Sequence, residues 1–366
     1  MTGSMGGKVI LGLAVLLMAG AASGEGAPVA IATAIQPKVI TEPVPHDSDD
    51  PAIWINRTDP LKSLVLGTDK NSDGGLFAFN LDGKIVAQAR GLQRPNNVDV
   101  LTGFRLGGET MDIAVVTERE MQRLRVFRLP DLTPLDRGDL VVFDGDKERA
   151  PMGIALYQRP RDHVAFAIVG GKTGPKEGYL WQYRLEDDGA GMIRMSLVRK
   201  FGSFTGEKEI ESIAVDASVG SVYYSDESYG VREYAADPDS KDADRELSVS
   251  GREGFAKDRE GISIYPLTEK AGYLVVSDQG ANSFRIFRRE SPEGELRQHE
   301  FLKAVQVAAV DSDGSDVTAV PLGPKFPSGL FVAMSADRTY HFYSWGDMAG
   351  GDLGPAAGNP TPGEGK

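Results

Sequence analysis

Cysteine is absent from all 366 residues of the chain. This absence excludes disulfide bonds, thiolate nucleophiles and cysteine-ligated metals, so packing or bound ions must stabilise the fold. Histidine is scarce as well, because there are only four: His46, His163, His299 and His341. They are scattered and form neither an Arg-His-Gly phosphatase motif nor an HExxH zinc motif, so histidine-based phosphate transfer is not expected.

Two further catalytic motifs are missing or incomplete. Gly-x-Ser-x-Gly does not occur, which argues against the nucleophile elbow of the α/β hydrolases. Gly171-Lys172-Thr173 imitates the end of a P-loop, but Phe166 stands where the first glycine belongs and no helix is predicted to follow. Nucleotide binding at this run is therefore excluded.

Long apolar runs are also rare, and the one at the N-terminus has the pattern of a targeting signal. Lys8 is its only charge, Val9 to Ala22 are apolar, and Ser23 and Gly24 are small. We interpret residues 1–24 as a signal peptide and expect a secreted or periplasmic protein without membrane contact after cleavage. A membrane anchor is the alternative, but the stretch is short for a bilayer span and no comparable run follows.

Basic residues are outnumbered, with 40 Lys and Arg against 53 Asp and Glu and a net charge of −13. Such a balance disfavours nonspecific binding to nucleic acid or anionic lipid. Carboxylates in this number suit hard cations instead.

No long amphipathic helix is predicted, and a repeat of strands takes its place. A three-part phrase recurs six times: a polar start with an apolar run, a second apolar run, and a strand rich in aromatics. The phrases begin 47 to 59 residues apart, at Asp50, Asn97, Met152, Glu211, Glu260 and Asp316. Six units of three or four antiparallel strands predict an all-β, six-bladed β-propeller. A β-sandwich with irregular loops would explain the strands but not the sixfold recurrence.

The propeller is expected to span residues 25–346. A strand around 29–39 should close the ring on the last blade, whose aromatic strand ends near Trp345 without an outer neighbour. Residues 347–366 are rich in Gly and Pro and are predicted to form a disordered tail.

In a propeller the first strand of each blade lines the central channel, so equivalent strand ends converge on one mouth. A hairpin from the first to the second strand places the start of one beside the end of the other. The polar residues at these two kinds of position are Asp49, Asp50, Asn97, Glu211, Asp258, Glu260 and Asp316, and Lys70, Arg119, Lys172, Glu227 and Gln279. Carboxylates gathered at one rim repel one another unless cations lie between them, which predicts a calcium cluster; solvated turn residues are the alternative.

Two loops resemble calcium loops, at residues 69–74 and 311–316. Neither is a complete EF-hand, and Asn80 stands where the first would need its twelfth-position Glu, so an ordinary turn explains it equally well. The second loop, with Asp311 and Asp316, is favoured as a ligand loop.

Lys70, Arg119 and Lys172 come from successive blades at equivalent positions beside the acids. Divalent ions together with Lys and Arg suit a polyanionic substrate, because both neutralise phosphoryl oxygens and a metal-bound water is a usable nucleophile. Hydrolysis of a phosphate ester is the predicted reaction; surface solubility is the alternative role of the three cations.

Seven motifs occur in order along the blades: Asp49-Asp50-Pro-Ala-Ile-Trp54, Asn96-Asn97-Val-Asp99, Glu211 at a strand start, Asp258-x-Glu260-Gly261, Gly272-Tyr-Leu, Gln279-Gly280 and Gly329-Leu-Phe-Val332. From Glu42 to about Met334 the chain thereby resembles the β-propeller phytases. The resemblance implies a six-bladed, calcium-dependent enzyme. Such an enzyme releases phosphate from phytate, myo-inositol hexakisphosphate, by attack of a calcium-activated water without a covalent enzyme intermediate.

The resemblance also implies residue roles. Calcium ligands are implied at Glu42, Asp49, Asp50, Glu211, Glu227, Asp258, Glu260, Gln279, Asp311 and Asp316. Among these, Glu211, Asp258 and Glu260 would be catalytic. Lys70, Arg119 and Lys172 would bind substrate phosphates, and a monomer is expected.

Three positions depart from the family pattern. Met152 replaces a usual tyrosine that contacts phosphate, Thr173 replaces a common acid, and Asn71 replaces a second lysine of some members, which implies a less basic pocket. A calcium-dependent lactonase-like propeller and a noncatalytic calcium-binding propeller are the competing functions.

Overall fold

The computed structural model describes residues 33–146, 148–291 and 297–354. One compact unit begins at Ala34. The predicted signal peptide, residues 1–24, lies outside the described residues. In the part of the chain that is described, no helix is long and apolar enough to cross a membrane.

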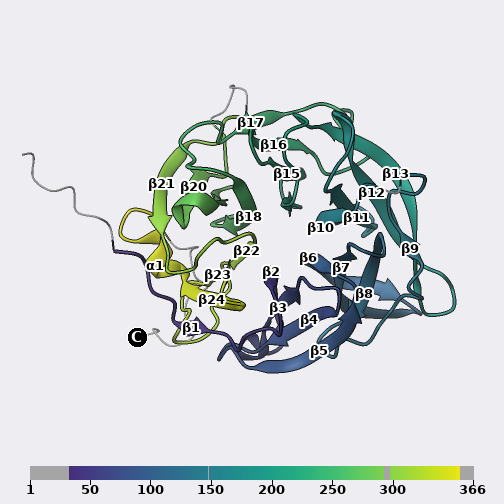
Figure 1. The fold of residues 1–366 in the computed structure, drawn as a ribbon, viewed down its shortest axis with the longest axis horizontal. Coiled ribbons are helices and arrows are strands. Elements are labelled where there is room, and N and C mark those ends of the chain that lie inside the picture. The colour runs from purple at the N-terminus through teal and green to yellow at the C-terminus, as the bar shows by residue number, and fades with distance from the viewer. Residues whose placement is uncertain (1–32, 147, 292–296, 355–366) are drawn as a thin grey trace, which may run out of the picture. The chain divides into compact units, whose positions relative to one another are not determined.

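The unit is a ring of six antiparallel sheets of four strands each, arranged as blades around a common axis (Figure 1). The predicted all-β, six-bladed propeller is thus confirmed. The first three blades are formed by β2 (Ser48–Trp54), β3 (Leu64–Asp69), β4 (Gly74–Phe79) and β5 (Ile85–Leu92); β6 (Pro95–Leu106), β7 (Glu109–Glu118), β8 (Arg123–Arg128) and β9 (Leu140–Val141); and β10 (Pro151–Gln158), β11 (Ala165–Gly171), β12 (Glu177–Asp187) and β13 (Ile193–Ser203).

The last three blades follow the same order from the axis outward. They are formed by β14 (Ile213–Asp216), β15 (Ser221–Asp226), β16 (Gly230–Ala235) and β17 (Ser248–Ser250); β18 (Arg259–Pro266), β19 (Gly272–Asp278), β20 (Ser283–Arg288) and β21 (Phe301–Gln306); and β22 (Ser315–Thr318), β23 (Leu330–Ser335), β24 (Thr339–Ser344) and β1 (Val39–Ile40). The described helices are short: η1 (Pro60–Lys62), η2 (Gln279–Ala281) and α1 (Trp345–Ala349).

The ring closes through the last blade, which takes its outer strand from the N-terminal side of the chain. β1 pairs with β24, with Val39 opposite Phe342 and Ile40 opposite His341. The predicted closing strand is confirmed, at the C-terminal end of the expected segment 29–39. Closure by backbone hydrogen bonds ties the two ends of the propeller together and leaves no open junction between blades.

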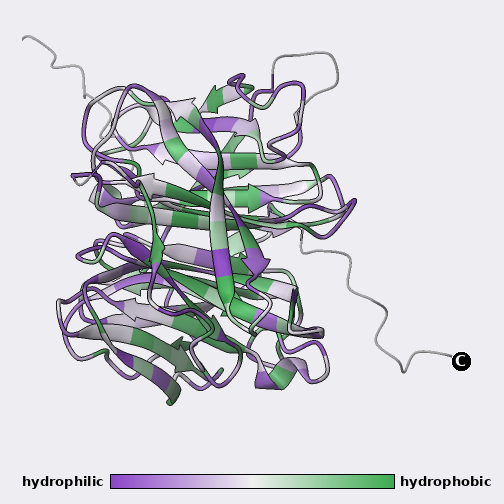
Figure 2. Cartoon of the chain, turned by 90° about the vertical axis from the view of Figure 1, so that its right-hand side faces the viewer, coloured by the Kyte–Doolittle hydropathy of each residue, from purple (hydrophilic) through white to green (hydrophobic). Residues whose placement is uncertain are grey.

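Apolar side chains form one cluster at each of the six junctions between neighbouring blades. Middle strands such as β4 and β15 are buried along their whole length, because both of their faces meet an adjacent blade. The outer strand β5 alternates between half-buried and exposed residues, as expected for a strand with one wet face. Figure 2 shows the hydrophobic segments concentrated on the strands and the hydrophilic ones on many of the connecting loops.

The predicted tail begins inside α1. Trp345 stacks on Tyr265 with ring centroids 3.9 Å apart, and Met348 and Ala349 are fully or almost fully buried against the last two blades. These two residues are therefore packed rather than disordered, because α1 covers the apolar end of that junction. Residues 355–366 lie outside the described residues.

We expect Met348→Ala to lower the free energy of unfolding by about 2–5 kcal/mol, because it removes a buried side chain and leaves a cavity. Urea unfolding followed by tryptophan fluorescence measures the change. Gly351→Ala is the matched control, since an added Cβ there meets no atom within 4 Å. An unchanged midpoint for Met348→Ala would place this residue outside the packed core.

Candidate active site

The strand register gathers the predicted site residues at one end of the ring. Ser48 lies opposite Asp69, and Pro95 lies opposite Glu118, so the starts of first strands meet the ends of second strands. In four blades the register shifts directly after this first pair, as in a β-bulge; the shifts fall between Ser48 and Pro51, Pro95 and Val98, Pro151 and Ile154, and Arg259 and Ile262. Such a shift redirects side chains at a strand start, and here the affected residues include Asp49, Asn96 and Glu260.

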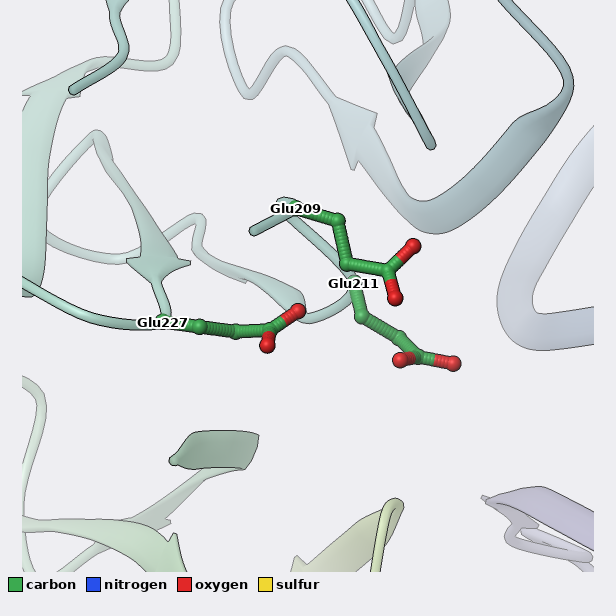
Figure 3. Close-up of side chains that lie close together, drawn as sticks. All are labelled: Glu209, Glu211 and Glu227. Carbon is green, nitrogen blue, oxygen red and sulfur yellow. The ribbon is translucent and has the colours of Figure 1, made fainter. Parts of the chain in front are cut away.

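Five acidic side chains converge at this mouth in two overlapping groups. Carboxylate oxygens of Glu209, Glu211 and Glu227 lie within 4.8 Å of one another, and so do oxygens of Glu227, Asp258 and Glu260. Figure 3 shows Glu209, Glu211 and Glu227 converging from two separate loops. Glu227 belongs to both groups. The acids therefore come from three places: the loop before β14, the loop after β15, and the start of β18 with the residue just before it.

Burial and mutual repulsion disfavour ionisation of this cluster. Burial, followed by the charges of Glu209 and Asp258, raises the pKa of Glu227 to about 8. The pKa of Glu260 is raised by burial and then by Glu211 and Glu227. One oxygen each of Glu227 and Glu260 is buried without a hydrogen-bond partner. Oxygens of this kind require a proton or a cation, so the residues present fit a divalent metal ion.

A second acidic group surrounds Lys70. The Lys70 Nζ lies 2.5 Å from Asp49 Oδ1 and 3.2 Å from Asp313 Oδ2. Burial alone would lower the pKa of Lys70, but the charges of Asp49 and Asp313 raise it overall. Burial raises the pKa of Asp49 to about 7, against the opposing charge of Lys70. Gln279 completes the group by donating from Nε2 to Asp313 Oδ1 at 2.6 Å.

Asn96 joins the two acidic groups. Its Nδ2 donates to Asp49 Oδ2 at 2.9 Å and to Glu211 Oε1 at 3.0 Å, and its Oδ1 accepts from Arg119 at 3.4 Å. On the far side of Glu211, Lys172 Nζ lies 2.7 Å from Glu209 Oε2. All three predicted cations, including Lys70, therefore lie beside the acids at this mouth.

Asp50 and Asp316 lie apart from this cluster, deeper in the channel. With Asp99 they line a cavity of about 160 Å³. Each accepts a backbone N–H from the first strand of the next blade: Val98 N–H to Asp50 Oδ2 at 3.1 Å, Ile53 N–H to Asp316 Oδ2 at 2.7 Å, and Leu156 N–H to Asp99 Oδ2 at 2.6 Å. Burial raises the pKa of Asp316 to about 7. These acids join neighbouring blades by hydrogen bonds.

Two other predicted ligands lie outside both groups. Glu42 accepts from Ile85 N–H at 2.9 Å at the opposite end of the first blade, and it pairs with Lys84. Asp311 is exposed, and its backbone N–H donates to Asn282 Oδ1 at 2.9 Å. In the 311–316 loop it is Asp313 that faces Lys70 and Gln279.

Sequence reasoning missed four residues at the mouth: Glu209, Asp313, Lys208 and Arg94. Lys208 forms an ion pair with Asp258. A signal existed for three of them, because Glu209 lies two residues before Glu211, Arg94 lies two residues before the Asn96 motif, and Asp313 is the central acid of the recognised loop. Lys208 lies in a loop without a recognisable motif.

Fold and site together define a β-propeller whose mouth combines a metal-competent carboxylate cluster with lysine and arginine side chains. The sequence profile of the phytase family matches residues 7–341. The chain therefore belongs to the phytase family, and it is an enzyme of the phytase class.

A curated relative agrees with this assignment. The chain is 28% identical over 308 residues to the 3-phytase of Bacillus subtilis (strain 168), covering 80% of this chain and 75% of the relative. Solved structures with a similar arrangement include the Dos1 propeller, at 13% identity and a TM-score of 0.40, which covers 83% of this chain and 68% of that one. Another is the Cps50 (Swd1) β-propeller domain of Myceliophteria thermophila, at 10% identity and a TM-score of 0.44, with coverages of 80% and 82%. The six-bladed assignment rests on the strand pairing within this chain.

We expect stability in the presence of EGTA to fall as the pH rises from about 5 to about 8. Glu227 has a pKa of about 8 in the folded protein against 4.5 when unperturbed, so the folded state binds the extra proton. Its contribution is complete below the lower value and is lost as the pH rises through the higher one. The unfolding temperature, plotted against pH across this range, should fall less steeply for Glu227→Gln than for the wild type. Glu109→Gln, at an exposed position, should keep the wild-type slope.

Proposed function

We propose that this phytase hydrolyses phytate, myo-inositol hexakisphosphate, to lower inositol phosphates and phosphate, and that calcium ions held at the propeller mouth are required. One observation carries the proposal. Two clusters of carboxylates have Glu227 in common, and Lys70, Lys172 and Arg119 lie beside these clusters. Negative and positive groups are thus interleaved at one opening. A polyanionic substrate needs both, because its phosphates must meet bound cations and basic side chains together.

The oxygen-only donor set supports calcium. Glu211, Glu227, Asp258 and Glu260 would hold the ions, with Asp49 and the Gln279 carbonyl at the border of the cluster. Hard carboxylate and carbonyl oxygens favour Ca²⁺ over metals that prefer sulfur or imidazole. When bound, calcium neutralises phosphoryl oxygens and raises the nucleophilicity of water. The other implied ligands, Asp50, Asp311, Asp316 and Glu42, would belong to places outside this cluster.

The chain's own residues bind and orient the substrate. Lys70 and Lys172 contact Asp49 and Glu209, and they would transfer part of this pairing to phosphate oxygens when substrate arrives. Among the described residues, the Arg119 side chain forms a single long hydrogen bond, to Asn96, and so keeps its other donors available. Asn96 holds the carboxylates of Asp49 and Glu211 in a fixed relation to each other.

Competing functions explain less of this site. A calcium-dependent lactonase-like enzyme or a noncatalytic calcium-binding propeller accounts for the acids but gives no role to the three cations.

The apolar stretch from Val9 to Ala22 supports export to the periplasm or the medium through a signal peptide. We further propose that the mature protein acts as a monomer.

Purified mature protein should release phosphate from phytate when Ca²⁺ is present, and EGTA in excess should abolish the release. The physical reason is that the mouth carboxylates repel the substrate until cations neutralise them. Colorimetric phosphate determination measures the effect, and restoring Ca²⁺ after EGTA is the control for irreversible damage. Equal release with and without EGTA would overturn the calcium requirement.

Acid and base substitutions at the mouth should affect different kinetic constants. Asp258→Asn should lower kcat at least about a hundredfold because it removes charge from the proposed catalytic centre. Arg119→Ala should raise KM about tenfold with a smaller change in kcat, because it removes a phosphate contact made in both ground and transition states. Glu109→Gln serves as control at the far end of the second blade. Wild-type kinetics in both mouth variants would refute the assignment.

A further inference from the structure

Two arginines whose backbones are hydrogen-bonded to each other lie at the mouth, between the first two blades. Arg94 ends the loop that leads into β6, and Arg119 follows β7. The Arg119 N–H donates to the Arg94 carbonyl at 3.0 Å, and the Arg94 N–H donates to the Asn71 carbonyl at 2.8 Å. Backbone hydrogen bonds thus tie both arginines to the loop that begins at Lys70.

Neither arginine has a carboxylate at ion-pair distance in the part of the chain that the structure describes, although the charges of Glu209, Glu211 and Asp49 act on Arg119 from farther away. Within the same described residues, the long Arg119 contact with Asn96 is their only side-chain hydrogen bond. The Arg94 Nε is buried without an acceptor. Burial has the largest effect on the pKa of Arg119, and the charge of Arg94 has the second largest. Both lower this pKa, which agrees with two like charges held near each other. Lys70, Lys172 and Lys208, in contrast, all have carboxylate partners.

The backbone at Arg94 is also unusual. Its φ is +57°, in the left-handed region that favours glycine and disfavours a long side chain. Strained backbone of this kind tends to occur where a side chain serves binding or catalysis. If the residue served only to close the loop, glycine at this position would remove the backbone strain.

We propose that Arg94 is a further substrate-binding residue, which forms with Arg119 a clamp for a phosphate group of the substrate. Each guanidinium presents five N–H donors in a planar fork that matches phosphate oxygens, and a phosphate between the two forks supplies the missing negative charge. The inference rests on the proposed function, which brings phosphate groups to this mouth.

Arg94→Gly separates binding from folding, because glycine suits the left-handed backbone. We expect KM for phytate to rise about tenfold, kcat to stay within about twofold, and the urea midpoint to be unchanged or higher. The inhibition constant of myo-inositol hexakissulfate, a polyanion that is not cleaved, should rise by a similar factor. Arg94→Lys keeps the positive charge but loses the planar fork of donors. Its KM and its inhibition constant should therefore lie between those of the wild type and of Arg94→Gly. Arg90→Ala, an exposed arginine on β5, should behave as wild type.

The outcomes discriminate between the inference and the function. If the wild type hydrolyses phytate but Arg94→Gly keeps its KM and its inhibition constant, the clamp is refuted and the proposed function stands. If the wild type releases no phosphate, the proposed function fails. Binding of the hexakissulfate, measured by calorimetry, then decides the clamp: its weakening in Arg94→Gly supports the arginine pair as a polyanion site, and equal binding overturns it.

Discussion

Repulsion among buried carboxylates at the propeller mouth is the constraint on which the site depends. Glu227 and Glu260 are each about 4% exposed, and their carboxylates cannot separate because the blades that carry them are fixed by apolar clusters at every junction. Packing of the ring thus holds like charges together at a cost in free energy. Protons offset that cost at low pH, and cations can offset it at higher pH. Metal binding and the stability of the fold are therefore linked through the same oxygens.

Acidic residues of one repeat pattern serve two different purposes. Asp50, Asp99 and Asp316 accept backbone N–H groups across blade junctions and thereby keep the channel wall in register, although burial still raises the pKa of each carboxyl. Glu227 and Glu260 have oxygens that the scaffold leaves unsatisfied. A buried carboxylate with backbone donors is structural, whereas one without donors requires a ligand. The adjacent residues Asp49 and Asp50 have different partners, because Asp49 accepts from the Asn96 side chain and pairs with Lys70, whereas Asp50 accepts from the Val98 backbone.

The sequence was sufficient for the fold because every blade repeats the same alternation of apolar and polar residues. It was also sufficient for Asp49 and Glu260, which lie at strand starts, and for Glu211, which lies two residues before β14, since strand phase fixes which end of the ring they occupy. The phase of the strands does not determine the conformation of the loops, however. Glu209 and Asp313 reach the site through loop conformation, Arg94 through a left-handed backbone, and Glu42 leaves it because it pairs with the turn before β5. Long-range loop packing decides such positions, and no periodic pattern encodes it.

The carboxylate cluster and the two arginines at the mouth come from different blades and form two halves of the site. The loops before β14 and after β15 and the start of β18 supply the acids of the cluster, whereas the loops after β7 and before β6 supply two arginines that form no ion pair with any described carboxylate. Between them Asn96 contacts both halves through Asp49, Glu211 and Arg119. A ligand with a single negative charge could satisfy only one half. A polyanion with several phosphates can meet bound cations on one side and guanidinium groups on the other, so the charge pattern itself favours a multiply phosphorylated substrate.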